Sequence, residues 1–141
     1  MTSPREEEEP VTANRWAVRA RTAPSASDVP PADDVLDEEL TRIERRIDDV
    51  ITQGRAEFTE GSDSYDRATV AILRLAALFE SDERFGELLG VVTLEERRGI
   101  ITTRNIAAHS GYGAMNTEIF WRTVTERLPE VIARIRATYR D

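Results

Sequence analysis

The sequence predicts an all-α fold, a bundle of four or five helices, on three observations. Apolar residues recur at steps of three and four from Val35 almost to the end of the chain, which is the period of an amphipathic helix. Few segments alternate with the period of two that a strand needs, and glycines and helix-capping residues separate the periodic stretches. The 141 residues, 40% of them hydrophobic, are enough for one globular domain.

Residues 1–34 are predicted to be a disordered or poorly packed acidic, proline-rich tail. Five of the six prolines and a run of four glutamates fall in this segment. Such a composition offers too little apolar surface to offset the entropy of ordering the chain. The helical domain is therefore predicted to span residues 35–141.

The first helix is predicted from a single apolar stripe, with Asp and Arg on its other faces. The stripe is formed by Leu36, Leu40, Ile43, Ile47, Val50 or Ile51, and Phe58, with Gly54 near the end of the helix. Gly61-Ser62-Asp63 predicts a turn followed by a second helix. That helix has one apolar face of Ala68, Ile72, Leu75, Ala76 and Phe79, with Val70, Leu73 and Leu78 beside it. A helix that is apolar on several faces is typical of a central position.

The second half of the domain is predicted to hold one short and two long helices. Phe85–Leu89 forms a short helix that Gly90 closes. Thr93 and Glu96 match a capping box and open a long helix that reaches Ala107.

The last helix follows the break that Gly111 and Gly113 make in the chain. Asn116 or Thr117 caps this helix. Pro129 lies inside its apolar pattern and predicts a kink or a restart, because proline lacks the amide hydrogen that the helix needs.

Composition excludes several kinds of site. The chain has no cysteine, so disulfides, thiolate metal ligands and cysteine nucleophiles are excluded. It has one histidine, His109, so one chain cannot build a multi-histidine metal site, and no metal or other cofactor is expected. Apolar stretches fall far short of the roughly 20 residues of a membrane helix. The acidic start of the chain has no secretory signal, so a cytoplasmic location is expected.

The charges are distributed unevenly along the chain. Residues 35–96 contain 7 Arg and 16 acidic residues, a net charge of −9, whereas residues 97–140 contain 8 Arg and 3 acidic residues, a net charge of +5. The overall charge of −8 argues against a generic nucleic-acid binder. The basic last third is nevertheless expected to attract an anionic ligand, while the acidic segment faces away from it or binds something else.

One short segment, Arg104–Tyr112, contains the candidate catalytic residues Arg104, Asn105 and His109. On an ideal helix, five residues rotate by about 500°, so Arg104 and His109 point roughly 140° apart. Asn105 and His109 are four residues apart and share a face. Convergence of Arg104 on His109 therefore requires either a break near His109 or a second copy of the helix across a two-fold axis.

On spacing alone, an Arg and a His five residues apart are typical of a surface ion pair and a half-buried polar residue, since so short a motif occurs readily by chance. The surrounding sequence is more specific. Arg104-Asn105 leading to His109 resembles the R-N-x-x-x-H signature of the HEPN superfamily. The stretch from Leu36 to Ile135 is similar to the HepT-like ribonuclease toxins of that superfamily. The similarity includes Tyr112, which follows the motif, and the segment 116–130.

The resemblance implies a HEPN-like helical bundle that forms a homodimer through the motif helices. It implies a metal-independent endoribonuclease toxin, paired with a minimal nucleotidyltransferase antitoxin. In this interpretation His109 is the general acid and base, Arg104 binds the phosphate and Asn105 orients the site. These residue types suit RNA cleavage, because a histidine can move the proton of the 2′-hydroxyl near neutral pH and an arginine can stabilise the charge on the phosphate.

The sequence departs from the family pattern at Tyr112. The family places a tyrosine two residues after the histidine, and the antitoxin adenylylates it, whereas Tyr112 lies three residues after His109. Tyr112 is therefore either the adenylylation site, on a loop that Gly111 and Gly113 allow to bulge, or a residue that packs at the helix end.

The inserted residue also leaves a second function open. This second function is that of a catalytically inert HEPN-like module that binds or regulates a nucleotidyltransferase. A third possible function is that of a generic helical dimerisation domain. Phe120 and Trp121 could stack on RNA bases, but their helical spacing favours packing in the core or in a dimer.

Overall fold

The structure is a computed structural model that describes residues 29–109 and 115–140. In chain order its elements are α2 (Ala32–Gln53), a 3₁₀ turn (Arg55–Glu57), α3 (Asp63–Phe79), α4 (Asp82–Phe85), α5 (Leu94–Ala108), α6 (Thr117–Arg122), a π-helical turn (Thr123–Arg127) and α7 (Leu128–Ala137). The described residues contain no strand, so the predicted all-α bundle is confirmed.

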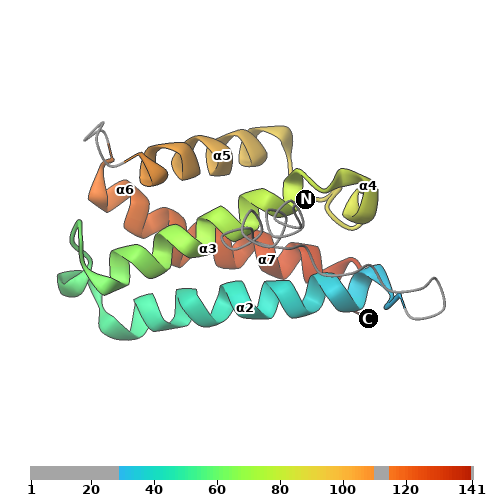
Figure 1. The fold of residues 1–141 in the computed structure, drawn as a ribbon, viewed down its shortest axis with the longest axis horizontal. Coiled ribbons are helices and arrows are strands. Elements are labelled where there is room, and N and C mark those ends of the chain that lie inside the picture. The colour runs from blue at the N-terminus through green and yellow to red at the C-terminus, as the bar shows by residue number, and fades with distance from the viewer. Residues whose placement is uncertain (1–28, 110–114, 141) are drawn as a thin grey trace, which may run out of the picture.

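The bundle is built from four long helical segments, α2, α3, α5 and the continuous run from α6 to α7, together with the short α4 (Figure 1). Successive long segments run antiparallel (Figure 1). The helix α3 packs against both α2 and α5, so its predicted central position is confirmed. The helix α5 lies at one edge of the bundle, with α3 between it and α2 (Figure 1).

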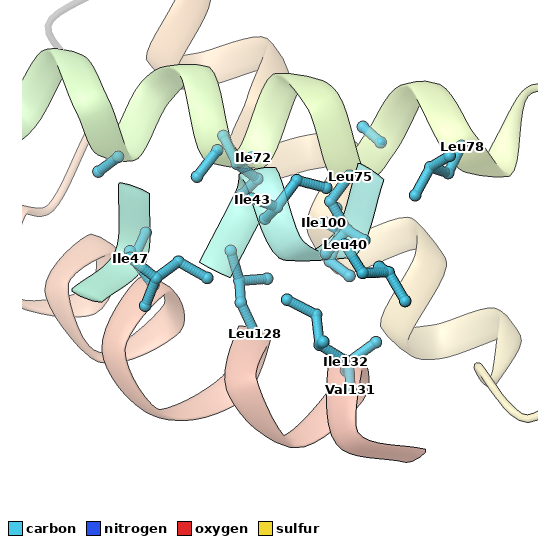
Figure 2. Close-up of a cluster of buried hydrophobic side chains, with 14 of the residues drawn as sticks. Leu40, Ile43, Ile47, Ile72, Leu75, Leu78, Ile100, Leu128, Val131 and Ile132 are labelled. Carbon is cyan, nitrogen blue, oxygen red and sulfur yellow. The ribbon is translucent and has the colours of Figure 1, made fainter. Parts of the chain in front are cut away.

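The core lies between α2, α3 and α7. Figure 2 shows apolar side chains from these three helices, and Ile100 from α5, meeting in one cluster. The predicted stripe of the first helix is buried, and of the two alternatives at its end Val50 is buried while Ile51 is exposed. The exposed apolar residues Val70 and Leu73 show that α3 is not covered on all sides.

The first helix differs from its prediction at both ends. It begins at Ala32, three residues before Val35 and inside the segment assigned to the tail, because Pro31 precedes it and Asp33 and Asp34 place negative charge in its first turn. It ends at Gln53, where Gly54 takes a φ of 90° that favours glycine. The rest of the predicted tail, residues 1–28, lies outside the described residues.

Phe58 is consequently not part of that helix. It is nevertheless fully buried, with its ring 5.5 Å from Tyr65, 5.4 Å from Phe120 and 5.3 Å from Trp121, centroid to centroid. These four rings form an aromatic cluster that joins the end of α2 to the starts of α3 and α6. Phe120 therefore lies in the protein core and Trp121 packs against it, as their helical spacing predicts.

Side chains cap the later helices where the sequence predicts. The Ser62 hydroxyl accepts a hydrogen bond from the Tyr65 amide at 3.1 Å and starts α3. The Thr93–Glu96 capping box of α5 is confirmed with both of its hydrogen bonds. Of the two candidates for the last helix, Asn116 is the cap.

Two local predictions need correction. The short helix α4 occupies Asp82–Phe85 rather than Phe85–Leu89, because the amides of Arg84 and Phe85 donate to the Ser81 carbonyl at 3.0 and 3.2 Å and start the helix after Ser81. Turns follow it, and Phe85 and Leu89 are both buried. Pro129 does mark an irregularity, but the chain widens into a π-helical turn over Thr123–Arg127 and resumes as α7.

Candidate functional site

The N-terminal end of α5 is held firmly to the bundle. The Arg97 side chain donates hydrogen bonds to the carbonyl oxygens of Leu89 at 2.7 Å and Val92 at 3.3 Å, and its guanidinium lies 5.2 Å from the Phe79 ring centroid. Arg134 on α7 pairs with Glu96. This contact, together with hydrogen bonds from Thr93, holds the pKa of Glu96 below its ordinary value.

The rest of α5 faces outward. Only Ile100 and Ala107, seven residues apart and hence on one face, are buried. The exposed residues of α5 include Leu94, Gly99, Thr102 and Asn105. A Cβ added at Gly99 would meet no atom within 4 Å, so the space beside it is open. An exposed glycine inside a helix costs about 0.5–1 kcal/mol relative to alanine, and nothing within the described subunit explains it.

The helix ends where the catalytic interpretation requires. Ala108 is the last helical residue, and His109 leaves the helix with φ −114° and ψ 71°. Its amide donates to the Ile106 carbonyl at 3.2 Å, and its side chain is exposed. The predicted break near His109 is therefore present. Tyr112, with the glycines on either side of it, lies outside the described residues, so its role as an adenylylation site stays a prediction.

Arg104 is held by two neighbours. Its Nη1 donates to Glu80 Oε1 at 2.6 Å, and its Nε donates to Asn105 Oδ1 at 3.1 Å. The Arg104 side chain is 22% exposed, whereas that of Glu80 is 60% exposed. Asn105, which was predicted to orient the site, thus contacts Arg104. Glu80 was missed by the sequence reasoning, because nothing along the chain relates two residues 24 positions apart.

The contact between Arg104 and Glu80 joins α5 to the C-terminal end of α3. Glu80 directly follows Phe79, whose ring lies beneath Arg97, and Arg97 precedes Arg104 by roughly 10 Å along the axis of α5. Two arginines of α5 thus contact the same end of α3. Among the predicted site residues, the structure brings Arg104 and Asn105 into contact.

The basic last third of the chain is largely occupied by contacts inside the protein. Arg136 pairs with Asp37 at 3.2 Å and with Glu44, and Arg140 pairs with Asp37 at 2.7 Å. Burial raises the pKa of Asp37, but hydrogen bonds from Tyr139 and both arginines lower it by more, so that it lies below its ordinary value. The acidic first helix thus forms ion pairs with arginines in and after the last helix.

Other features of the described residues do not add to the site. A surface pocket of about 680 Å³ is lined by Asp33, Arg84 and their neighbours near α4, at the opposite end of the bundle from His109. The described residues contain no group of three or more His, Asp and Glu side chains that could hold a metal ion. None of the described helices combines the length and apolar character needed to cross a lipid bilayer.

Comparisons with known proteins leave the chain without an assigned relative. No protein-family model, no curated protein and no solved structure matches it. The similarity to HEPN and HepT-like proteins accordingly remains an interpretation of Arg104, Asn105, His109 and their surroundings.

Proposed function

We propose that the protein is a metal-independent endoribonuclease, the toxin of a toxin–antitoxin pair, whose site is completed across a homodimer. The observation that carries the proposal is the position of His109. It is exposed at the end of a capped helix on the edge of the bundle, four residues after Asn105, which accepts a hydrogen bond from Arg104. An exposed histidine in such a position can exchange protons with a substrate at neutral pH.

The chemistry needs only these residue types and the RNA itself. His109 would take the proton of the 2′-hydroxyl as the oxygen attacks the adjacent phosphorus, and a histidine would return a proton to the departing 5′-oxygen. Arg104 would stabilise the charge that develops on the phosphate oxygens. The products would be a 2′,3′-cyclic phosphate and a 5′-hydroxyl.

A second copy would add its own Arg104 and His109 to the site. The exposed side of α5 extends over about 120°, from Gly99 through Thr102 to Asn105, and a helix of a second subunit can approach closely at the glycine. A two-fold axis beside this face would pack the two α5 helices together and form one cleft between them. That cleft would contain two arginines and two histidines.

The test is RNA cleavage by the purified protein in EDTA, compared with the variant His109→Ala. Loss of general acid–base catalysis lowers the rate by about 10²- to 10⁴-fold. Thr52→Ala is the matched control, because Thr52 is exposed on α2, away from α5. Cleavage that leaves cyclic-phosphate ends and requires His109 but not Thr52 supports the proposal, whereas equal cleavage by all three proteins refutes it.

A second candidate function is the inert HEPN-like module that binds or regulates a nucleotidyltransferase. The contact between Arg104 and Glu80 favours it, because the arginine is already paired with a carboxylate. In this case purified protein cleaves no RNA, yet forms a complex with a minimal nucleotidyltransferase. The mass of the protein after incubation with that enzyme and ATP then reports whether Tyr112 receives an adenylyl group, with Tyr112→Phe as the control.

A further inference from the structure

The ion pair between Arg104 and Glu80 has a consequence for the access of any anion to Arg104. We infer that Glu80 acts as an internal competitor for the phosphate that Arg104 is proposed to bind. The inference rests on the proposed function for the identity of the ligand, a phosphodiester. It deepens that function by assigning a residue that regulates the site.

The geometry of the pair is that of an exchangeable contact. The Glu80 carboxylate lies 2.6 Å from Nη1, where a phosphate oxygen would otherwise accept the same hydrogen bond. Glu80 is mostly exposed and caps the C-terminal end of α3, so water can replace Arg104 around it at little cost. The guanidinium is more buried than the carboxylate, so the exchange would change the partner of Arg104 rather than expose it.

The second contact of Arg104, with Asn105, holds one end of its guanidinium during the exchange. Asn105 Oδ1 accepts from Nε, which lies on the guanidinium next to the stem of the side chain. With Nε held there, the outer nitrogens can leave Glu80 while Arg104 stays beside Asn105. Release from Glu80 leaves the outer nitrogens of Arg104 available to a phosphate that takes the place of the carboxylate.

The size of the effect follows from the exposure of the pair. Exposed ion pairs contribute little to stability, and a competitor of that strength lowers the apparent affinity for a phosphate by about two- to fivefold. Loss of one negative charge near the site adds to the effect in the same direction. We therefore expect Glu80→Gln to bind RNA more tightly than the wild type, the opposite of the result for a residue that positions Arg104 for substrate.

The experiment measures the dissociation constant of a 2′-O-methyl RNA oligonucleotide, which cannot be cleaved because its nucleophile is blocked. Glu80→Gln should bind about two- to fivefold more tightly than the wild type. Glu39→Gln is the matched control. It removes the same charge and breaks another Arg–Glu pair, with Arg74 at 2.6 Å, on the opposite side of α3 from α5. The gain from Glu80→Gln should vanish in an Arg104→Ala background.

Equal or weaker binding by Glu80→Gln, or a gain that persists without Arg104, overturns the inference. A second readout separates this inference from the ribonuclease proposal: the NMR signal of the Arg104 Nε–H group, followed during titration with inorganic phosphate. The signal should respond at a lower phosphate concentration in Glu80→Gln than in the wild type. If no variant binds or cleaves RNA, the ribonuclease proposal fails, and this titration alone upholds or overturns the role of Glu80.

Discussion

Replacing Arg136 by Met tests whether the charges at the end of the chain stabilise the fold. Arg136 lies between α7 and α2, where its side chain is 14% exposed. It donates hydrogen bonds to Asp37 Oδ1 at 3.2 Å, to Thr41 Oγ1 at 2.8 Å and to Glu44. Methionine retains much of the apolar stem, so Arg136→Met mainly removes these polar contacts.

The expected loss in the free energy of unfolding follows from the hydrogen bonds that each partner of Arg136 loses. Hydrogen bonds to charged groups contribute about 1.5–3 kcal/mol each, but both carboxylates are partly exposed. Asp37 also keeps Tyr139 and Arg140 as donors, at 2.8 and 2.7 Å. We therefore expect a loss of about 2–3 kcal/mol in the free energy of unfolding, less than the cost of breaking a fully buried pair. For a domain of this size that corresponds to about 10 °C in Tm.

The assay is urea unfolding followed by circular dichroism, with Arg127→Met as the control because Arg127 is an exposed arginine on the same helical run. The midpoint should fall for Arg136→Met while the slope of the transition stays constant. A surface substitution typically changes the free energy of unfolding by less than about 0.5 kcal/mol. If the two variants differ by less than this, the charge asymmetry of the sequence has no role in holding α7 to α2.

Three further predictions concern stability. In the folded protein the pKa values of Asp37 and Glu96 lie below their ordinary values of 3.8 and 4.5, so both carboxylates stabilise the fold at a pH above these ordinary values. Their contribution to the free energy of unfolding should decline as the pH falls through the folded-state pKa values. Acid unfolding curves measure this decline, and a free energy of unfolding that stays constant below pH 5 would contradict it. Phe58→Ala should cost about 3–5 kcal/mol in urea unfolding, because a buried ring with three aromatic neighbours leaves a cavity, and a loss below 1 kcal/mol would show that the cluster closes around it. Gly99→Ala should stabilise the subunit by about 0.5–1 kcal/mol, measured at a concentration where it is monomeric, since its Cβ has room; destabilisation would indicate a neighbour at that face.

Local chemistry and periodicity were sufficient to predict most of the fold. The Thr93–Glu96 capping box depends on residues three positions apart, which the sequence displays directly. The stripe of the first helix was also correct up to Val50, because burial of one helix face repeats every three or four residues. Phe58 was misplaced because the sequence continues the apolar spacing past Gly54, while the chain turns there.

The candidate site was predictable in part. The sequence placed His109 at the end of the capped helix, and this is confirmed, since a helix end depends on nearby residues. It did not identify the partner of Arg104, because Glu80 comes close only when α3 and α5 pack side by side. For the same reason the sequence did not predict the ion pairs of its basic last third. Asp37 and Glu44 pair with Arg136 only because α2 and α7 pack together in the fold.

The position of α5 at the edge of the bundle also determines how the protein would open. A helix that buries two side chains, Ile100 and Ala107, is expected to have a lower free energy of local unfolding than α2 or α3. Arg97 and Arg134 hold its N-terminal end and Arg104 pairs with Glu80 further along, so opening would begin after Arg104, at the end that leads to His109. Amide hydrogens near His109 would exchange with deuterium before those of the core. Heating would then abolish a function that depends on His109 several degrees below the temperature at which the bundle itself melts.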